Sequence, residues 1–425
     1  MITKSLLELS VSISSGLTPL RSNSEFWEKG TISWLKTEQL CEKYIYETNE
    51  HISTKALDQT SIKIFPENSL SIAMYGEGKT RGNLSILRKP MATNQACCNV
   101  VVDPQKADFE YVYYFLKTQY EELRNLSSGV RKNLNSNDIK GYPIRLPEKL
   151  SEQKAIANVL KSLDDKIELN NRINAELEAM AKMLYDYWFV QFDFPDANGK
   201  PYKASGGKMV YNDALKREIP EGWSASNILS VANLLGGGTP SKSKEEHWNG
   251  HIPFFTPSDS DNNVFSIETE SYITDLGLEK SSTRLFEKNT VFITARGSVG
   301  RLALNSVPMA MNQSCYALKP KNGISFSFLF YLTKELIHHL EVKASGSVFN
   351  SIVSNDIEFT NLALPDDKTI IERFAEMAEP IFKRIEIGTL ENKQLSSQRD
   401  WLLPMLMNGQ VTVKPSTESK EAQHG

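Results

Sequence analysis

The sequence is poor in cysteine, and its four cysteines have no metal-binding or disulfide spacing. Cys97 and Cys98 are neighbours, whereas Cys41 and Cys315 stand alone, so no Cys-x-x-Cys pair exists. A disulfide framework or a zinc site is therefore not expected, and a reducing cytoplasm is the expected compartment. The sequence also lacks any run of 18 apolar residues, which argues against a membrane-spanning helix.

A surplus of basic charge is missing as well. The chain has 48 Lys and Arg against 52 Asp and Glu, which gives a formal net charge of −4. A protein that binds nucleic acid through charge alone usually carries a basic surplus, so a free-standing binder of that kind is not expected. DNA binding in which a partner supplies phosphate contacts stays open. With 425 residues, 40% of them hydrophobic, the chain is long enough for two or three globular domains.

The sequence does contain an internal repeat. The Gly-Leu-Thr-Pro at 16–19 recurs 221 residues later as Gly-Gly-Thr-Pro, and the Ser-Asn-Asp-Ile at 136–139 recurs 218 residues later. An offset this constant over roughly 130 residues predicts a tandem duplication. Each copy combines short β-rich stretches, such as 71–74 or 291–294, with a helical stretch near 109–122 or 326–339. Each globule is therefore predicted to be α+β.

Each globule is followed by a long helix with the pattern of a coiled-coil seam. Seam positions alternate in steps of four and three residues, and a helix with such a stripe cannot bury it alone. The two helices are therefore predicted to pack on each other. The seam residues are Ile156, Leu160, Leu163, Ile167, Asn170, Asn174, Leu177, Ala181, Leu184 and Trp188 in the first helix, and Phe374, Ala378, Ile381, Ile385, Gly388, Asn392, Leu395, Arg399, Leu402 and Leu406 in the second.

Asn174 and Asn392 occupy equivalent positions in the two seams. A polar residue there lowers stability but fixes register and orientation. A looser, partly exposed middle of the seam explains the two residues equally well, and both interpretations stay open.

An aromatic connector separates the first long helix from the second globule. Trp188, Phe189, Phe192 and Phe194 lie at its start, followed by a stretch rich in Gly and Pro. Because such side chains would not be left in water, we expect an ordered connector.

No motif predicts a catalytic site. The segment 76–80 resembles a phosphate-binding loop, but Ala73 replaces the Gly that such a loop needs six residues before its Lys. Pro365-Asp366 followed by Glu391-Asn392-Lys393 formally fits the scattered acidic pattern of many nucleases, yet Glu391 and Lys393 flank a seam position on a predicted helix. Nuclease carboxylates must instead converge on a metal ion, so no metal site is predicted.

Two related globules joined by a helical spacer suit a reader of two separated DNA half-sites, with the spacer length setting the gap. Small, polar and cationic loop residues can contact base edges and phosphates. Tight connections explain the Gly-rich turns as well, so both interpretations stay open for each residue. The candidates are Lys36, Thr37, Lys79, Thr80 and Arg81 in the first globule, and Thr256, Ser258, Asp259, Arg296 and Ser298 in the second. Asn94-Gln95 and Asn312-Gln313 occur in both copies, which favours a role in the shared fold.

These motifs together resemble the specificity (S) subunit of a type I restriction–modification system. The resemblance is carried by GGGTPSKSKEEHWNGHIPFF, ITARGSVGRLAL, MNQSCYAL, SGSVFNSIVSNDIEFTNLALP and the connector WFVQFDFPDANGKPYKASGGKMVYN, and it covers nearly the whole chain. The first copy departs from it in SGLTPLRSNSEFWEKGTISWLK, which lacks the Gly-rich run and the Pro of IPF. The loop there is expected to differ.

The resemblance implies an α+β fold with two tandem target-recognition domains, separated by two long helices that pair as an antiparallel coiled coil. The expected boundaries are 1–147 for the first domain, 148–188 for the first spacer helix, 189–223 for the connector, 224–365 for the second domain, 366–412 for the second spacer helix and 413–425 for a disordered tail.

The resemblance also implies that each domain reads one half of a bipartite double-stranded DNA target. The paired helices would dock two methyltransferase (M) subunits and, through them, restriction (R) subunits. The chain itself would be non-catalytic and cytoplasmic, without membrane contact or a cofactor of its own. S-adenosylmethionine, ATP and Mg²⁺ are expected in the partner subunits, which methylate adenine and cleave DNA.

Three alternatives stay open. The chain could be the specificity subunit of a related combined restriction–methylation enzyme, a coiled-coil scaffold that binds only proteins, or a subunit that cuts DNA itself. The recognised DNA sequence does not follow from the residues.

Overall fold

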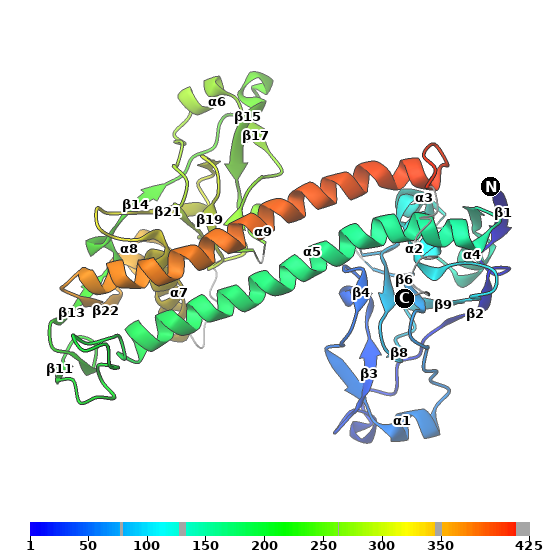
Figure 1. Ribbon diagram of the computed structural model, residues 1–425, viewed down its shortest axis with the longest axis horizontal. Coiled ribbons are helices and arrows are strands. Elements are labelled where there is room, and N and C mark those ends of the chain that lie inside the picture. Colours follow the sequence, from blue (N-terminus) through cyan, green and yellow to red (C-terminus); the bar gives the residue numbers. More distant parts are fainter. Residues whose placement is uncertain (77–79, 127–132, 262, 345–350, 414–425) are drawn as a thin grey trace, which may run out of the picture. The chain divides into compact units, whose positions relative to one another are not determined.

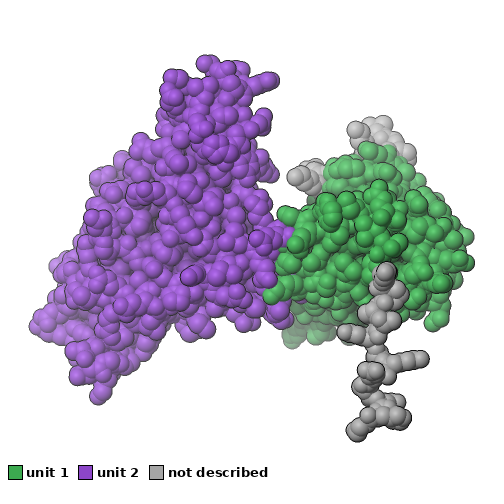
Figure 2. All heavy atoms as spheres, turned by 45° about the horizontal axis from the view of Figure 1, so that its top comes forward, with its two compact units in different colours: residues 1–166, 395–425 green, residues 167–394 purple. Residues whose placement is uncertain are grey.

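The computed structural model describes residues 1–76, 80–126, 133–261, 263–344 and 351–413 (Figure 1). The chain divides into two compact units, with residues 1–166 and 395 onward in unit 1 and residues 167–394 in unit 2 (Figure 2). Each unit holds one globular domain and part of both long helices, α5 (Leu150–Tyr185) and α9 (Thr369–Met407). Within the described residues, no helix is both long and apolar enough to cross a membrane. The expected tail lies outside these residues from 414 onward.

The domain of unit 1 is built on a five-stranded sheet in the order β2-β9-β6-β7-β4. Among the described strand pairs of this sheet, β4 and β7 are parallel and the others are antiparallel. A second sheet has the order β5-β3-β8, and β1 pairs with β10. The strands are β1 (Ile2–Ser5), β2 (Ser10–Ser15), β3 (Ile32–Leu35), β4 (Tyr44–Ile45), β5 (Glu50–Ile52), β6 (Leu70–Ala73), β7 (Leu84–Leu87), β8 (Ala92–Thr93), β9 (Cys97–Val102) and β10 (Pro143–Leu146), and the helices are α1 (Thr54–Gln59), α2 (Phe109–Thr118), α3 (Tyr120–Asn125) and α4 (Ser136–Gly141).

The domain of unit 2 repeats this topology strand for strand. Its sheets have the orders β14-β21-β18-β19-β16 and β17-β15-β20, and β13 pairs with β22. The same strand order in both domains confirms the predicted duplication. The strands are β13 (Trp223–Asn227), β14 (Ala232–Gly236), β15 (Trp248–Phe255), β16 (Phe265–Ser266), β17 (Tyr272–Ile273), β18 (Val291–Thr294), β19 (Leu302–Asn305), β20 (Ala310–Met311), β21 (Cys315–Pro320) and β22 (Asn361–Pro365), and the helices are α6 (Asp275–Glu279), α7 (Phe326–Lys343) and α8 (Ser354–Glu358).

The connector lies in unit 2 and is ordered, as predicted. Trp188, Phe189, Phe192 and Phe194 are all buried. The ring of Phe189 lies 4.8 Å from that of Phe328 in α7, so the connector adds aromatic side chains to the core of the second domain. It also forms a hairpin of β11 (Met209–Asn212) and β12 (Arg217–Pro220), which has no counterpart among the described strands of unit 1.

α5 and α9 run antiparallel, and all of the predicted seam residues are buried or half-buried. In unit 1, Asp164 of α5 contacts Arg399 of α9. In unit 2, Asn170 contacts Asn392. Figure 1 shows the two helices side by side. The predicted antiparallel coiled coil is therefore confirmed.

The middle of the seam is polar but closed. Asn170 is only 1% exposed, and its Nδ2 donates to Glu391 Oε2 at 2.9 Å and to Asn392 Oδ1 at 3.0 Å. Asn392 Nδ2 in turn donates to Asn171 Oδ1 at 2.7 Å. These bonds favour the interpretation in which polar residues fix the register over the looser one.

The equivalent residues Asn174 and Asn392 do not face each other. Asn174 instead lies against Gly388, where an added Cβ would come within 2.6 Å of Asn174 Oδ1. Gly388 is the repeat of Asn170, and Asn392 is the repeat of Asn174. The pairs Asn170–Asn392 and Gly388–Asn174 are therefore two versions of one contact, as a local two-fold axis through an antiparallel pair requires.

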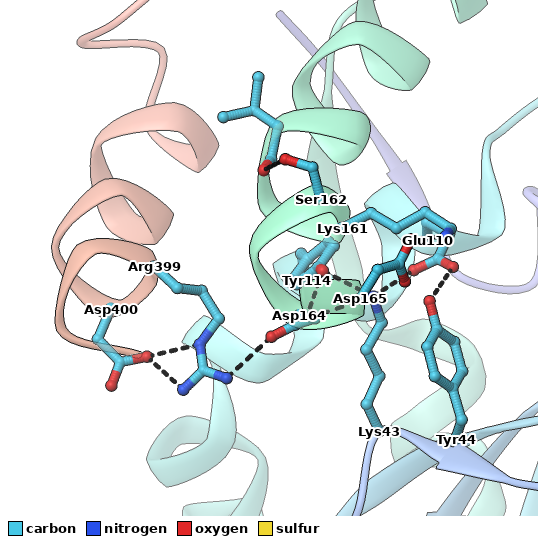
Figure 3. A network of polar contacts seen from close by, with 11 residues as sticks. Lys43, Tyr44, Glu110, Tyr114, Lys161, Ser162, Asp164, Asp165, Arg399 and Asp400 are labelled. Atoms are coloured by element: carbon cyan, nitrogen blue, oxygen red, sulfur yellow. Dashed lines mark hydrogen bonds and ion pairs between the residues drawn. The ribbon is translucent and has the colours of Figure 1, made fainter. Parts of the chain in front are cut away.

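Buried charges attach the first domain to the helices (Figure 3). Lys43 Nζ lies 2.9 Å from the Glu110 carboxylate and 3.3 Å from that of Asp164, and the Lys43 and Asp164 side chains are only 11% and 10% exposed. The Tyr114 hydroxyl and Arg399 Nη1 both donate to Asp164. Burial, and then the Asp164 carboxylate, raise the pKa of Tyr114 far above its usual value, which keeps it a donor. Asp164 thus joins α2, α5 and α9.

The same joint in unit 2 is aromatic. Phe382 occupies the repeat position of Asp164 and is fully buried. Its ring centroid lies 5.7 Å from those of Phe330 and Tyr331 in α7. Apolar packing therefore replaces the charge network.

Removing the Asp164 carboxylate should destabilise unit 1 selectively. We expect Asp164→Ala to cost about 1–3 kcal/mol, because the buried Lys43 would keep Glu110 but lose its second carboxylate, and Arg399 would lose its bond to α5. Native-state hydrogen exchange should show lost protection in α2 and β4, with α7 and β16 unchanged. Asp400→Ala, at an exposed partner of Arg399, is the control and should change stability by less than about 0.5 kcal/mol. Undiminished protection of α2 in Asp164→Ala would contradict this role.

A buried histidine in unit 2 has no hydrogen-bond partner for either ring nitrogen among the described residues. His247 is 2% exposed and ends a 3-10 turn over Glu245–His247. In the first copy, the equivalent turn Ser24–Phe26 ends on Phe26, which is also buried. The same buried position thus holds the apolar ring of Phe26 in the first copy and the unsatisfied polar ring of His247 in the second.

We therefore expect His247→Phe to stabilise unit 2 and Phe26→His to destabilise unit 1. Each change should shift the free energy of unfolding by about 1–3 kcal/mol, which is the cost of burying an unsatisfied polar group. Denaturant unfolding monitored by hydrogen exchange in each unit measures both. A loss of stability in His247→Phe would mean that the ring nitrogens are satisfied in solution.

Candidate nucleic-acid interface

The candidate DNA-contacting residues lie at the ends of two strands in each domain. In unit 1, a 3-10 turn over Thr37–Gln39 follows β3, and the hairpin between β6 and β7 contains Thr80 and Arg81. Lys79 lies outside the described residues. In unit 2, a 3-10 turn over Pro257–Asp259 follows β15, and the hairpin between β18 and β19 contains Arg296 and Ser298. The predicted candidates therefore lie in the same two loops of both domains.

A turn that contains the Asn-Gln pair holds these two loops together in unit 1. The backbone N–H of Asn94 donates to Leu35 O at 2.9 Å, at the end of β3. The N–H of Met74, directly after β6, donates to Ala96 O at 2.8 Å. The Thr18 hydroxyl adds a hydrogen bond to the Gln95 side chain.

The equivalent turn of the second domain makes the same contacts. We call this turn, residues 94–96 in unit 1 and 312–314 in unit 2, the clasp. Asn312 N donates to Phe255 O at 2.9 Å, Ala295 N donates to Ser314 O at 2.8 Å, and the Thr239 hydroxyl donates to the Gln313 side chain. The backbone approaches so closely that a Cβ at Gly237 would lie 2.2 Å from Asn312 O, so only glycine fits there. The role predicted for the Asn-Gln pairs in the shared fold agrees with these contacts.

The turn after β15 is a closed hydrogen-bonded unit. Asp259 Oδ2 accepts from the backbone N–H of Thr256 at 2.8 Å and from its hydroxyl at 2.6 Å, and Asp259 Oδ1 accepts from Glu270 N at 2.7 Å. Thr256 and Asp259 therefore build the turn. Ser258 is exposed at its tip, where its hydroxyl lies 2.7 Å from that of Thr256.

The hairpin after β18 is closed in a similar way. The buried Thr294 hydroxyl donates to Ser298 O and accepts from Arg301 N at 3.0 Å. Gly297, with φ of +84°, lies in the left-handed region that glycine adopts freely. Arg296 is exposed at the edge of this loop, so Arg296 and Ser258 are the outward candidates in unit 2.

In unit 1, Lys36 is engaged by carboxylates that the local sequence pattern did not reveal. Its Nζ lies 2.7 Å from Glu38 and 2.7 Å from Glu50. Hydrogen bonds to Glu38 and then to Glu50 raise the pKa of Lys36. The guanidinium of Arg21 also contacts Glu50 and lies 3.7 Å from the ring centroid of Trp27. Part of the positive charge in this loop is therefore already compensated.

Arg301, which is not among the predicted residues, reaches from the hairpin to the turn after β15. Its Nη1 donates to Ser260 O at 2.8 Å. In unit 1 the equivalent residue is Asn83, because Ala73 N donates to Asn83 O as Thr294 N donates to Arg301 O. The replacement of Asn83 by Arg301 between the two copies was the sequence feature that could have pointed to this residue.

Cys97, Cys98 and Cys315 are buried, whereas Cys41 is exposed. The described residues contain no group of three or more His, Cys, Asp or Glu side chains that could hold a metal ion. Burial raises the pKa of the Cys97, Cys98 and Cys315 thiols to about 12, so these groups are protonated at neutral pH.

Comparison with known proteins gives consistent matches. The family described as "Type I restriction modification DNA specificity domain" matches residues 4–179 and again residues 220–396. The type I restriction enzyme MjaIX specificity subunit of Methanocaldococcus jannaschii is 28% identical over 416 residues, covering 95% of this chain and 91% of that protein. The HindI specificity subunit of Haemophilus influenzae is 26% identical over 341 residues, or 69% and 74% of the two chains. The crystal structure of a type I S subunit from M. genitalium shows the same fold, with a TM-score of 0.58, 17% identity and 95% of both chains covered.

Each family match contains one domain and most of the long helix that follows it. The two copies are therefore tandem DNA specificity domains, and the family is that of non-catalytic specificity subunits. The chain belongs to the type I restriction–modification DNA specificity family.

Proposed function

We propose that each domain reads one half of a bipartite double-stranded DNA target, through the loops after β3 and β6 in unit 1 and after β15 and β18 in unit 2. The observation that carries this proposal is the contrast between scaffold and loops. The clasp is the same in both domains, whereas Lys36 and Thr37 are replaced by Thr256 and Pro257 at the start of the turn. One scaffold with different loop residues is what two readers of different half-sites require.

Exchange of one domain tests this function. Replacement of residues 1–147 by the corresponding domain of a relative should change one half of the methylated motif and leave the other half intact. Methylome sequencing of a strain that carries the hybrid shows both halves at once. A change in both halves would be incompatible with independent readers.

We further propose that the helices dock two M subunits, because α5 carries a second apolar stripe beside its seam. Leu169, Met180, Met183 and Tyr187 are 39%, 57%, 71% and 37% exposed, and their spacing fits the same heptad register as the seam. The second domain packs on a face of α5 other than this stripe, where the Tyr331 hydroxyl donates to Glu178 O at 3.0 Å. Exposed apolar side chains in such a row fit a helical protein partner.

The repeat places similar residues on α9. Ile387 repeats Leu169 and is 44% exposed, and Trp401 repeats Met183 and is 62% exposed. Two equivalent surfaces support two copies of one partner. In this proposal the M subunits bring S-adenosylmethionine, R subunits joined to them bring ATP and Mg²⁺, and this chain supplies the DNA sequence specificity.

Substitution of one apolar residue by glutamate should remove one M subunit at a time. We expect Met183→Glu and Trp401→Glu each to reduce the number of bound M subunits from two to one, and the double variant to bind none, because each site would lose an apolar anchor. Ala175→Glu places the same charge on an exposed part of α5 away from the stripe and should keep both partners. Native mass spectrometry of the co-expressed complex counts them. Two M subunits bound to Met183→Glu would refute this docking surface.

A further inference from the structure

We infer that Arg301 is a positioning residue for DNA recognition by the second domain, where it couples the two reading loops to each other. This inference rests on the proposed function. It assigns to Arg301 a role that acts through the loops and not through a contact of its own with DNA.

A continuous path of hydrogen bonds connects the hairpin to the neighbouring turn. The Thr294 hydroxyl donates to Ser298 O inside the hairpin and accepts from Arg301 N at 3.0 Å. The side chain of Arg301 then leaves the hairpin and donates from Nη1 to Ser260 O at 2.8 Å. Ser260 is buried and directly follows the turn over Pro257–Asp259. Arg301 therefore links the loop that presents Arg296 to the turn that presents Ser258.

The turn has its own internal support, so Arg301 is not needed to form it. Asp259 already accepts three hydrogen bonds from Thr256 and Glu270. The additional bond from Arg301 therefore fixes the position of the turn relative to the hairpin. Because Ser258 and Arg296 belong to different loops, simultaneous contact with one DNA half-site depends on that relative position.

The first domain provides a natural control. Asn83 occupies the position of Arg301 on the same strand pair, and its side chain is shorter and uncharged. At this repeat position, a guanidinium is therefore present in the second domain and replaced by a carboxamide in the first. A change at Arg301 should affect one half-site, and a change at Asn83 should affect neither by this route.

The exposure of Arg301 suggests a rival role, in which the guanidinium binds a DNA phosphate directly. Loss of a phosphate contact weakens binding to all sequences and lowers the slope of log affinity against log salt by about one. Loss of positioning instead relaxes discrimination at one half-site and leaves that slope unchanged. The two roles therefore differ in measurable quantities.

The experiment compares Arg301→Ala, Arg301→Gln and Asn83→Ala in the complex with M subunits, on duplexes that carry the methylated motif of the wild-type strain. We expect Arg301→Ala to lose about tenfold in affinity for the target and to tolerate wrong bases in half-site 2 only, with an unchanged salt slope. Arg301→Gln keeps a donor without the charge and should recover part of the discrimination. Asn83→Ala should behave as the wild type.

Hydrogen exchange of the free chain supplies a second readout that needs neither DNA nor partners. In Arg301→Ala, the amides of residues 258–260 and 296–300 should exchange faster together, while those of β15 and β18 stay protected. The inference would be overturned if the salt slope fell by about one and Arg301→Gln discriminated no better than Arg301→Ala. Unchanged discrimination in Arg301→Ala, or relaxed discrimination at both half-sites, would overturn it as well. Absence of bipartite binding by the wild-type complex would instead overturn the proposed function.

Discussion

The structure depends on the burial of a seam that neither long helix can bury alone. Ile156, Leu160 and Leu406 belong to one core in unit 1 together with the sheet of the first domain. The helix segment from residue 395 onward thus completes a domain that begins at residue 1. The first domain therefore cannot finish its core until the last helix of the chain is available. The first domain is therefore completed by residues from both ends of the chain.

The two copies have kept the same backbone topology but differ in the chemistry of the contacts between each domain and the long helices. Asp164 and Phe382 occupy the same place in the repeat, yet the first holds three polar partners and the second packs among aromatic rings. A charge network is directional and fails when one member is removed, whereas apolar packing tolerates substitution of similar volume. The two domains therefore share a topology without sharing the interactions that fasten it to the helices.

The sequence predicted those features that repeat at a fixed interval. The offset between the copies and the seam spacing are periodic, so they gave the tandem domains and the paired helices without any knowledge of contacts. The facing partners were not predictable in the same way. Asn392 meets Asn170 and not Asn174, because antiparallel pairing reverses the order of one copy relative to the other.

Contacts between loops left even less trace in the sequence. Lys36 was selected as a DNA contact from its residue type, but Glu50, which neutralises part of its charge, comes from a neighbouring strand. Thr256 and Asp259 were selected with Ser258, although the first two bond to each other to build the turn. Arg301 was missed, since its position at the start of a strand gives no sign that its side chain crosses to another loop.

Comparison of the copies separates scaffold from specificity more sharply than either copy alone. The contacts present in both copies, such as those of Asn94 with the end of β3 and of Asn312 with the end of β15, serve the fold. Two readers of different half-sites would not keep the same residue for reading DNA. The residues that differ on this shared frame are free to serve recognition. By this criterion Ser258, Arg296 and Arg301 belong together, although the guanidinium of Arg301 donates to Ser260 of the neighbouring turn. A recognition domain of this kind is therefore specified both by the side chains that face DNA and by the bonds that hold their loops in a common position.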